Sequence, residues 1–297
     1  MLACRALDLT ESCGTAIDAL IGLKFPAYYI EHPRKVLWIL HQYREAYDLW
    51  GHEFSGLHRY PAGLAVRDAI EQADRTLIPR ARAVFANSGN VAKRLKRYCG
   101  IESEPLYHPP PNSECFRCSE PQPYFFFPSR INRMKRQDLV VQALARTKNP
   151  VRVRFCGSGD DLAYAESLQP LCQQLGVARR VEWLGSVPEQ EKIAQYANAL
   201  AVIYPPLDED YGYVTLEAML SSKAVVTCSD SGGTLEFVVS GETGLIAEAN
   251  ADSLAAALDQ LWDNQTRTRN MGKASRDHYD DLGITWKHAI ERLLSCV

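Results

Sequence analysis

The sequence of 297 residues contains no run of 18 consecutive apolar residues, so it predicts no membrane-spanning helix. Its first residues also lack the long apolar stretch of a secretory signal peptide. Neither sign of charge is in large excess, because 33 Lys and Arg face 36 Asp and Glu, for a formal net charge of −3. This balance excludes a strongly basic nucleic-acid-binding protein. We therefore expect a cytoplasmic protein with no nucleic-acid partner.

The nine cysteines do not form the dense, even-numbered pattern of a disulfide-rich protein. They are odd in number and scattered along the chain, which indicates free thiols in a reducing compartment. Cys115 and Cys118 make a single C-x2-C pair, and no second pair completes the four ligands of a zinc site. We expect no metal there.

The sequence does contain an alternation of apolar runs of strand length with stretches of helix length. Most runs are continuous, as expected for parallel strands that are buried on both faces. The strand candidates are residues 18–23, 35–40, 83–86, 124–128, 151–156, 180–184, 200–204 and 224–227. Helices are predicted over residues 137–146, 162–175, 189–199 and 253–263. This alternation predicts an α/β fold with parallel sheets.

One segment, residues 109–123, is rich in proline and polar residues. Proline neither continues a helix nor serves a central strand, so we predict an interdomain linker there. It separates a domain over residues 1–108 from a domain over residues 124–297. The chain is long enough for each to bury its own core.

The sharpest motif places two glutamates eight residues apart, Glu209 and Glu217. Glu209 lies in the loop after the strand 200–204, and Glu217 lies one turn inside the helix that begins near Tyr213. Open α/β sheets bind ligands at such an edge, and the free N–H groups of a helix start attract phosphate. Gly212 lets the backbone approach a ligand closely, and carboxylates accept hydrogen bonds from sugar hydroxyls. An ordinary helix start with acidic residues is the alternative interpretation.

A second motif is a basic turn after the strand 124–128. It carries four cations within seven residues, namely Arg130, Arg133, Lys135 and Arg136. Arginine and lysine at this position are suited to holding a diphosphate. A solvated basic turn is the alternative. The glycine-containing turns at residues 157–159 and 232–236 are weak signals by themselves.

In this order and spacing, the motifs resemble those of family 4 glycosyltransferases. Ser129-Arg130…Lys135, Gly157-Ser158-Gly159, the Glu209–Glu217 pair and Gly232-Gly233-Thr234-Leu235-Glu236 carry the resemblance. It implies two Rossmann-like domains facing across a cleft, the GT-B arrangement. It also implies transfer of a hexose, with retention, from a UDP- or GDP-sugar to a glycan, lipid or small-molecule acceptor.

The resemblance assigns roles to individual residues. Arg130 and Lys135 would hold the diphosphate, Glu209 the hydroxyls of the transferred sugar, and Glu217 the ribose. Further contacts to the donor are expected at Gly157, Val187, Tyr211, Gly212, Tyr213 and Val214. His41, at a strand end, would face the donor sugar, unless it is a local capping or packing histidine. We expect no cofactor or metal, because the cations and the helix start replace a metal ion on the diphosphate.

The front of the first domain lacks the glycine-rich loop that the family carries there. We therefore expect a shortened N-terminal domain with an exposed sheet edge, which favours self-association. A nucleotide-sugar-binding protein with little transferase activity is the alternative function. The last helix, about residues 284–295, is expected to cross back to the first domain. A basic helix face formed by Lys93, Arg94, Lys96 and Arg97 is expected either to contact a membrane surface peripherally or to be solvated.

Overall fold

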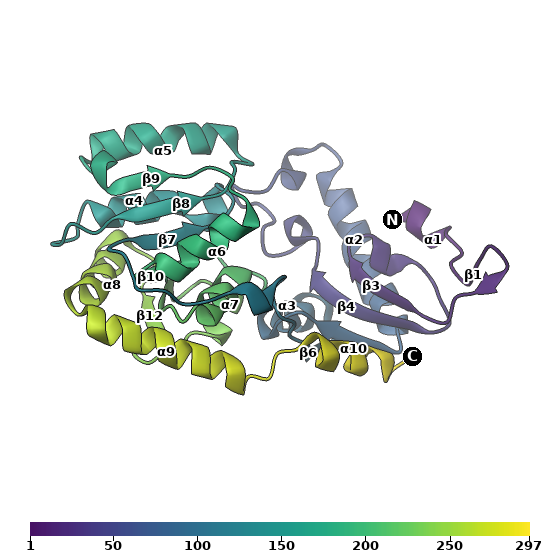
Figure 1. Cartoon of the computed structure of the whole chain (residues 1–297). Helices are drawn as coiled ribbons and strands as arrows, with labels where there is room; N and C mark the ends of the chain where they lie inside the picture. The colour runs from purple at the N-terminus through teal and green to yellow at the C-terminus, as the bar shows by residue number, and fades with distance from the viewer. The chain divides into compact units, whose positions relative to one another are not determined.

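The computed structural model describes all 297 residues, which form two compact units. The first unit combines Met1–His108 with Ile284–Val297, and the second is Pro109–Gly283 (Figure 1). Each of the eight strands predicted from the sequence is present, with ends displaced by at most two residues. The two main sheets are parallel throughout, as predicted.

The second unit is built on a six-stranded sheet in the order β12-β11-β10-β7-β8-β9. The strands are β7 (Phe125–Pro128), β8 (Val153–Cys156), β9 (Val181–Trp183), β10 (Ala201–Ile203), β11 (Val225–Cys228) and β12 (Gly244–Ala247). The helices are α4 (Gln137–Leu144), α5 (Leu162–Gln174), α6 (Glu189–Asn198), α7 (Tyr213–Leu220), α8 (Ala251–Asp263) and α9 (Gln265–Asp281). Numbered from β7, this is the doubly wound order 3-2-1-4-5-6 of dinucleotide-binding domains.

Helices cover both faces of this sheet. Phe125 and Phe127 point to one face and join the main core cluster, to which α4 and α8 contribute. Phe126 points to the other face and packs edge-on against Tyr196 of α6. Alternate residues of a strand face opposite ways, so burial on both sides explains the continuous apolar run.

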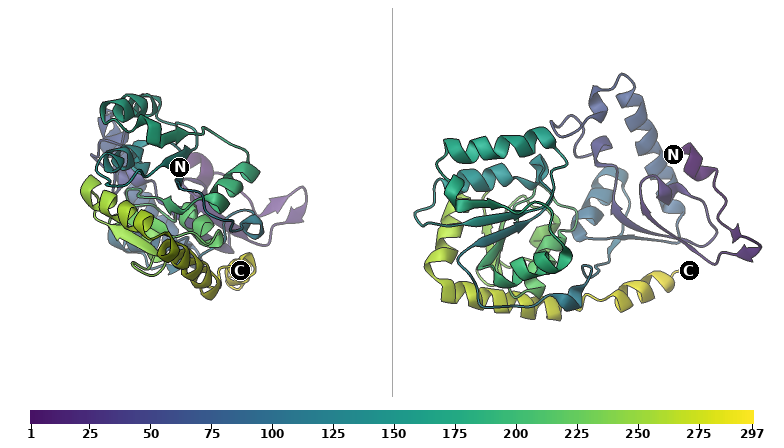
Figure 2. Two further views of the ribbon diagram at one scale, coloured as in Figure 1. Left: turned by 60° about the vertical axis from the view of Figure 1, so that its left-hand side comes forward. Right: turned by 45° about the horizontal axis from the view of Figure 1, so that its top comes forward.

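The first unit has a four-stranded sheet in the order β3-β4-β5-β6. Its strands are β3 (Leu20–Lys24), β4 (Lys35–His41), β5 (Ala83–Ala86) and β6 (Glu104–Pro105), beside a small hairpin of β1 (Glu11–Ser12) and β2 (Thr15–Ala16). Its helices are α1 (Leu2–Arg5), α2 (Gly63–Leu77), α3 (Gly89–Cys99) and α10 (Trp286–Leu294). Figure 2 gives two further views of the chain.

Helix α10 belongs to the first unit although it ends the chain. Its Ala289 and Leu293 are buried against Val36, Trp38 and Phe85 of the four-stranded sheet. At the edge of that sheet, Ile21 and Leu23 of β3 are partly exposed. Self-association through this edge stays a prediction.

Residues 109–123, expected as a linker, are part of the second unit. Phe116 is buried and packs edge-on against Tyr196, and the Ser119 amide donates to the Ala197 carbonyl. Apart from a 3-10 turn at Ser113–Cys115, this proline-rich segment has no helix or strand, yet it contributes an apolar contact to the core. No helix of the chain combines the length and the apolar character that crossing a bilayer requires.

Candidate functional site at the switch point of the second sheet

The strand order of the second unit places its binding edge between β7 and β10. These neighbours are paired, and the chain leaves them toward opposite sides of the sheet, so their following loops diverge. Such a switch point opens a crevice at the carboxyl ends of the strands. Both motifs predicted from the sequence follow these two strands: the basic turn follows β7, and the Glu209 loop follows β10.

Lys135 and Glu209 meet at this edge. The Lys135 ammonium pairs with the Glu209 carboxylate and donates to the Tyr204 hydroxyl at 3.1 Å. Asn132 fixes the turn of Lys135 by accepting a hydrogen bond from its backbone amide at 3.2 Å. Residues 74 positions apart in the sequence thus form one charged pair. Tyr204, the third partner, lay inside a predicted strand and was not among the predicted site residues.

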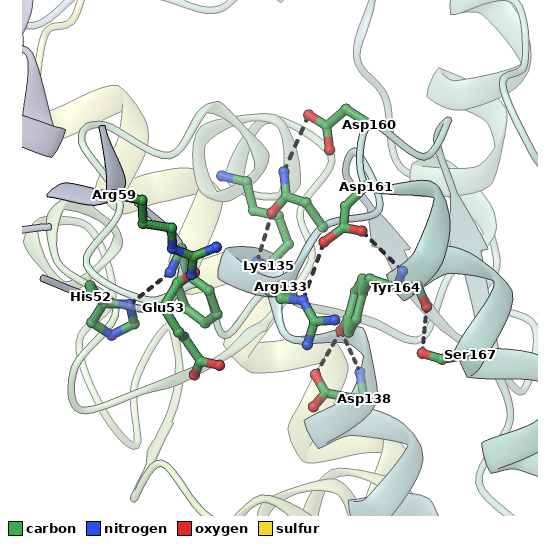
Figure 3. Close-up of polar contacts among 12 residues, drawn as sticks. His52, Glu53, Arg59, Arg133, Lys135, Asp138, Asp160, Asp161, Tyr164 and Ser167 are labelled. Carbon is green, nitrogen blue, oxygen red and sulfur yellow. Dashed lines mark hydrogen bonds and ion pairs between the residues drawn. The ribbon is translucent and has the colours of Figure 1, made fainter. Parts of the chain in front are cut away.

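The other cations of the basic turn are also paired, as Figure 3 shows for Arg133. The Arg130 guanidinium lies 2.7 Å from Asp160, and Arg133 lies 3.2 Å from Asp161. Arg136 makes a bidentate pair with Asp230, at 2.7 and 2.6 Å. The Arg130 side chain is 68% exposed, so its ion pair is weak and can be exchanged for another anion.

Glycines allow the loops after β7, β8 and β9 to touch. Gly157 has a φ of +143°, and a Cβ there would lie 2.1 Å from the Ser129 carbonyl oxygen. Its amide donates to the Gly185 carbonyl at 2.8 Å. The Val187 backbone hydrogen-bonds to the Cys156 thiol beside it. Gly157 and Val187, both predicted donor contacts, therefore lie in adjoining loops.

A second close approach joins the loops after β10 and β11. Gly212 has a φ of +84° before α7, and the Gly233 amide donates to the Glu209 carbonyl at 2.8 Å. The hydroxyls of Thr215 and Thr234, both within 4 Å of a Cβ built on Gly212, are buried without a hydrogen-bond partner. Unpaired buried hydroxyls are unusual in folded proteins. Thr234 belongs to the Gly232–Glu236 motif named from the sequence, but neither threonine was predicted as a site residue.

Glu217 is buried in α7, with 6% of its surface exposed. It accepts a hydrogen bond from the Tyr196 hydroxyl at 2.6 Å and from the Lys192 ammonium at 3.0 Å. Burial raises the pKa of Glu217 despite the nearby lysine. Burial alone would lower the pKa of Lys192, but contact with Glu217 raises it. Both residues that hold Glu217 come from α6, which the sequence analysis did not connect with it.

The other predicted contacts around Gly212 differ in exposure. Tyr211 is buried and packs edge-on against Phe237, whereas Tyr213 at the start of α7 is 37% exposed. Val214 is half-buried and packs against the core cluster. Of the three side chains, that of Tyr213 is the most exposed, and the contacts of all three with a donor stay predictions.

In the first unit, His41 ends β4 and is half-buried. Its Nδ1 lies 2.8 Å from the backbone carbonyl of Gln42, the contact expected of a locally capped histidine. Its role toward a donor stays a prediction.

The predicted basic face of α3 is wrong in one member, because Arg94 is buried while Lys93, Lys96 and Arg97 are exposed. Arg94 lies three positions after buried Val91 and so shares the inner face of the helix.

The chain contains one stretch with Asp-x-Asp spacing, Asp208-Glu209-Asp210, so the prediction that no metal is needed rests on the cations and the helix start alone. In the structure, no three His, Cys, Asp or Glu side chains gather in a group that could hold a metal ion.

Known structures with the same fold were found for both units. Anabaena Alr3699/HepE in complex with UDP and glucose superposes with a TM-score of 0.72 at 20% identity, over 91% of this chain and 74% of that one. Sucrose-phosphate synthase from Thermosynechococcus elongatus superposes with a TM-score of 0.75 at 18% identity, over 92% and 71%. Two Rossmann-like units with parallel sheets thus place the chain in the GT-B fold class.

The family follows from sequence comparison. The model of the family "Glycosyl transferases group 1" matches residues 115–278, more than half of the chain, and the chain belongs to this family. A D-inositol 3-phosphate glycosyltransferase of Nocardia farcinica is 29% identical over 260 residues, which are 78% of this chain and 57% of the relative. An alpha-maltose-1-phosphate synthase of Mycolicibacterium smegmatis is 33% identical over 58% of this chain and 47% of the relative. The chain spans about half the length of the curated relatives it matches.

Proposed function

We propose that this chain transfers a hexose from a nucleoside diphosphate sugar to a glycan, lipid or small-molecule acceptor, with retention of configuration and without a metal, as in family 4. The observation that carries this proposal is the meeting of Lys135 and Glu209 at the switch point of the second sheet. It brings a cation suited to a diphosphate next to a carboxylate suited to sugar hydroxyls.

In this proposal, Arg130 and Lys135 neutralise the negative charge that develops on the leaving diphosphate. Glu209 orients the sugar, and the amides that follow Gly212 contact the phosphate at the start of α7. Glu217 has oxygen lone pairs beyond those used by Tyr196 and Lys192, and these accept hydrogen bonds from the ribose.

UDP-glucose is the donor to test first, because the similar Anabaena protein was crystallised with UDP and with UDP-glucose. A donor present at 100 times its dissociation constant should stabilise the fold by about 2.7 kcal/mol, which a thermal-shift screen of UDP- and GDP-sugars detects. Release of nucleoside diphosphate that depends on an added acceptor would then show transfer. NMR of the product would show whether the anomeric configuration is retained.

Two outcomes would contradict the proposal. If none of the nucleotide sugars stabilises the protein, it does not use them as donors. Donor binding without acceptor-dependent release, over a panel of inositol phosphates, sugar phosphates and lipids, would favour a nucleotide-sugar-binding protein.

A further inference from the structure

A cavity lies at the other end of the second unit's sheet, where the strands begin. It has a volume of about 520 Å³ and is bounded by Leu200, just before β10, and by the turn Ser222–Lys223, just before β11. Residues 118–121 form one wall and α9 forms another. The Lys223 turn follows the C-terminus of α7, whereas Gly212 precedes its N-terminus. The cavity is therefore separate from the switch-point site.

Helix α9 turns one polar face toward this cavity. Thr266, Arg269, Asn270 and Lys273 all line it, and their spacing of i, i+3, i+4 and i+7 puts them on one side of the helix. This face supplies two cations, an amide and a hydroxyl. All four groups donate hydrogen bonds.

Lys223 faces them from the opposite wall. It is only 3% exposed, although lysine is rarely buried unless it is paired. Burial lowers the pKa of Lys223, and the Cys118 thiol is its hydrogen-bonding neighbour. The carboxylate that acts electrostatically on Lys223 is Glu120, which pairs with Arg269 at 2.8 Å and is largely exposed. Three cations and one carboxylate, +3 and −1, leave a net charge of +2 around the cavity.

The walls of the cavity are fixed relative to each other. Gly272 of α9 packs directly on the turn, because a Cβ there would lie 2.1 Å from the Ser222 carbonyl oxygen. The Lys223 amide is tied to the Ala218 carbonyl at 2.9 Å, and Arg276 donates to the Leu220 carbonyl at 3.1 Å. The cations are thus mounted on packed helix ends and not on a free loop, which lowers the entropic cost of binding.

We propose that this cavity binds a small phosphate-bearing metabolite. Several cations combined with an amide and a hydroxyl match the oxygens of a phosphate group. The volume is that of a small-molecule site, which ranges over roughly 300–1,000 Å³. Lys223 would provide the deepest contact, and Arg269 and Lys273 would close over the phosphate from α9.

Inorganic pyrophosphate is the probe, and the readout is the set of backbone amide signals in a two-dimensional NMR titration of the whole chain. Because pyrophosphate is also expected to bind at Arg130, the titration is done on the Arg130→Gln variant. The signals of residues 222–223 and 266–273 should shift in a saturable way. Lys223→Met and Lys273→Gln should each weaken the affinity at these signals by about tenfold or more.

Arg267→Gln is the matched control, since it removes a cation from the same helix but outside the cavity wall. It should leave the affinity within about twofold, as expected for an exposed charge that makes no contact with the ligand. Lys273 is exposed, so its variant remains informative if Lys223→Met does not fold. The proposal is overturned if pyrophosphate shifts no signals at the cavity, or if Arg267→Gln weakens binding as much as Lys273→Gln does. Neither outcome depends on glycosyl transfer.

Discussion

The role of Glu217 is the most direct test of the switch-point site, and the structure indicates which substitution to use. The carboxylate accepts hydrogen bonds from Tyr196 and Lys192 while only 6% exposed. Glu217→Ala would leave a half-buried lysine and a fully buried hydroxyl without their partner, and the resulting loss of stability would confuse binding with unfolding. Glu217→Gln keeps the shape and one acceptor oxygen, so we expect a loss of only about 1–3 kcal/mol.

For nucleotide binding, Glu217→Gln should weaken the affinity for UDP by about 5- to 150-fold, which corresponds to 1–3 kcal/mol for a hydrogen bond to a charged group. Calorimetry with UDP and with its 2′-deoxy analogue isolates the ribose contribution. The wild-type protein should prefer UDP, and the variant should lose most of that preference. Glu189→Gln is the control, because Glu189 also lies 3.0 Å from Lys192 but is more exposed.

The same carboxylate should make binding depend on pH. Burial raises the pKa of Glu217 above its usual 4.5, so the carboxylate takes up a proton at a higher pH than an exposed glutamate. A protonated carboxyl has fewer acceptor sites, so the affinity for UDP should fall as the pH is lowered toward that raised pKa. If the wild-type protein and Glu217→Gln discriminate equally between UDP and its 2′-deoxy analogue, the proposed contact between Glu217 and the ribose is refuted.

Four further outcomes are expected. Arg130→Ala and Lys135→Ala should each weaken the binding of UDP more than the binding of uridine, and the difference should grow at low salt. Equal losses of affinity for both ligands would show that the basic turn is only a solvated surface segment. Transfer activity should persist in the presence of a chelator. Loss of activity in the chelator, followed by its restoration with added manganese or magnesium, would establish a metal requirement. Gly157→Ala should cost roughly 2–4 kcal/mol in urea unfolding because of its contact with the Ser129 carbonyl, against about 1 kcal/mol for Gly176→Ala, where φ is also positive but the space is open. The protein should bind the donor well but transfer the sugar slowly, and sedimentation should show self-association. Efficient transfer by a strict monomer would contradict both expectations.

The sequence was sufficient to predict the strands and the loops that carry the site, because both depend on local patterns. Continuous apolar runs marked strands buried on both faces, and the motifs that follow β7 and β10 meet because adjacent parallel strands end at the same edge. No knowledge of side-chain contacts is needed for either inference.

Sequence reasoning failed where a partner is selected by packing between distant segments. Lys192 and Tyr196 reach Glu217 only because α6 lies against the sheet, and nothing in the local sequence of α6 indicates this. Phe116 shows the same limit, since a proline-rich segment that was expected to be a linker buries an aromatic ring against Tyr196. Arg94 was assigned to the surface on charge alone, although its helical position places it inside.

The charged groups predicted to bind a donor are held in place by opposite charges of the protein itself. Lys135 pairs with Glu209, and Glu217 pairs with Lys192. In each pair both side chains are at most about a quarter exposed, with the values 12% and 21% for the first and 23% and 8% for the second. Partial burial strengthens these attractions and restricts the side-chain rotamers, so less conformational entropy remains to be lost when a ligand binds. In the proposed donor complex, a diphosphate that binds Lys135 would not have to order a free lysine, and the Glu209 carboxylate would remain directed at the sugar hydroxyls. This preorganisation explains why one substitution in either pair should affect both the stability of the fold and the affinity for the donor.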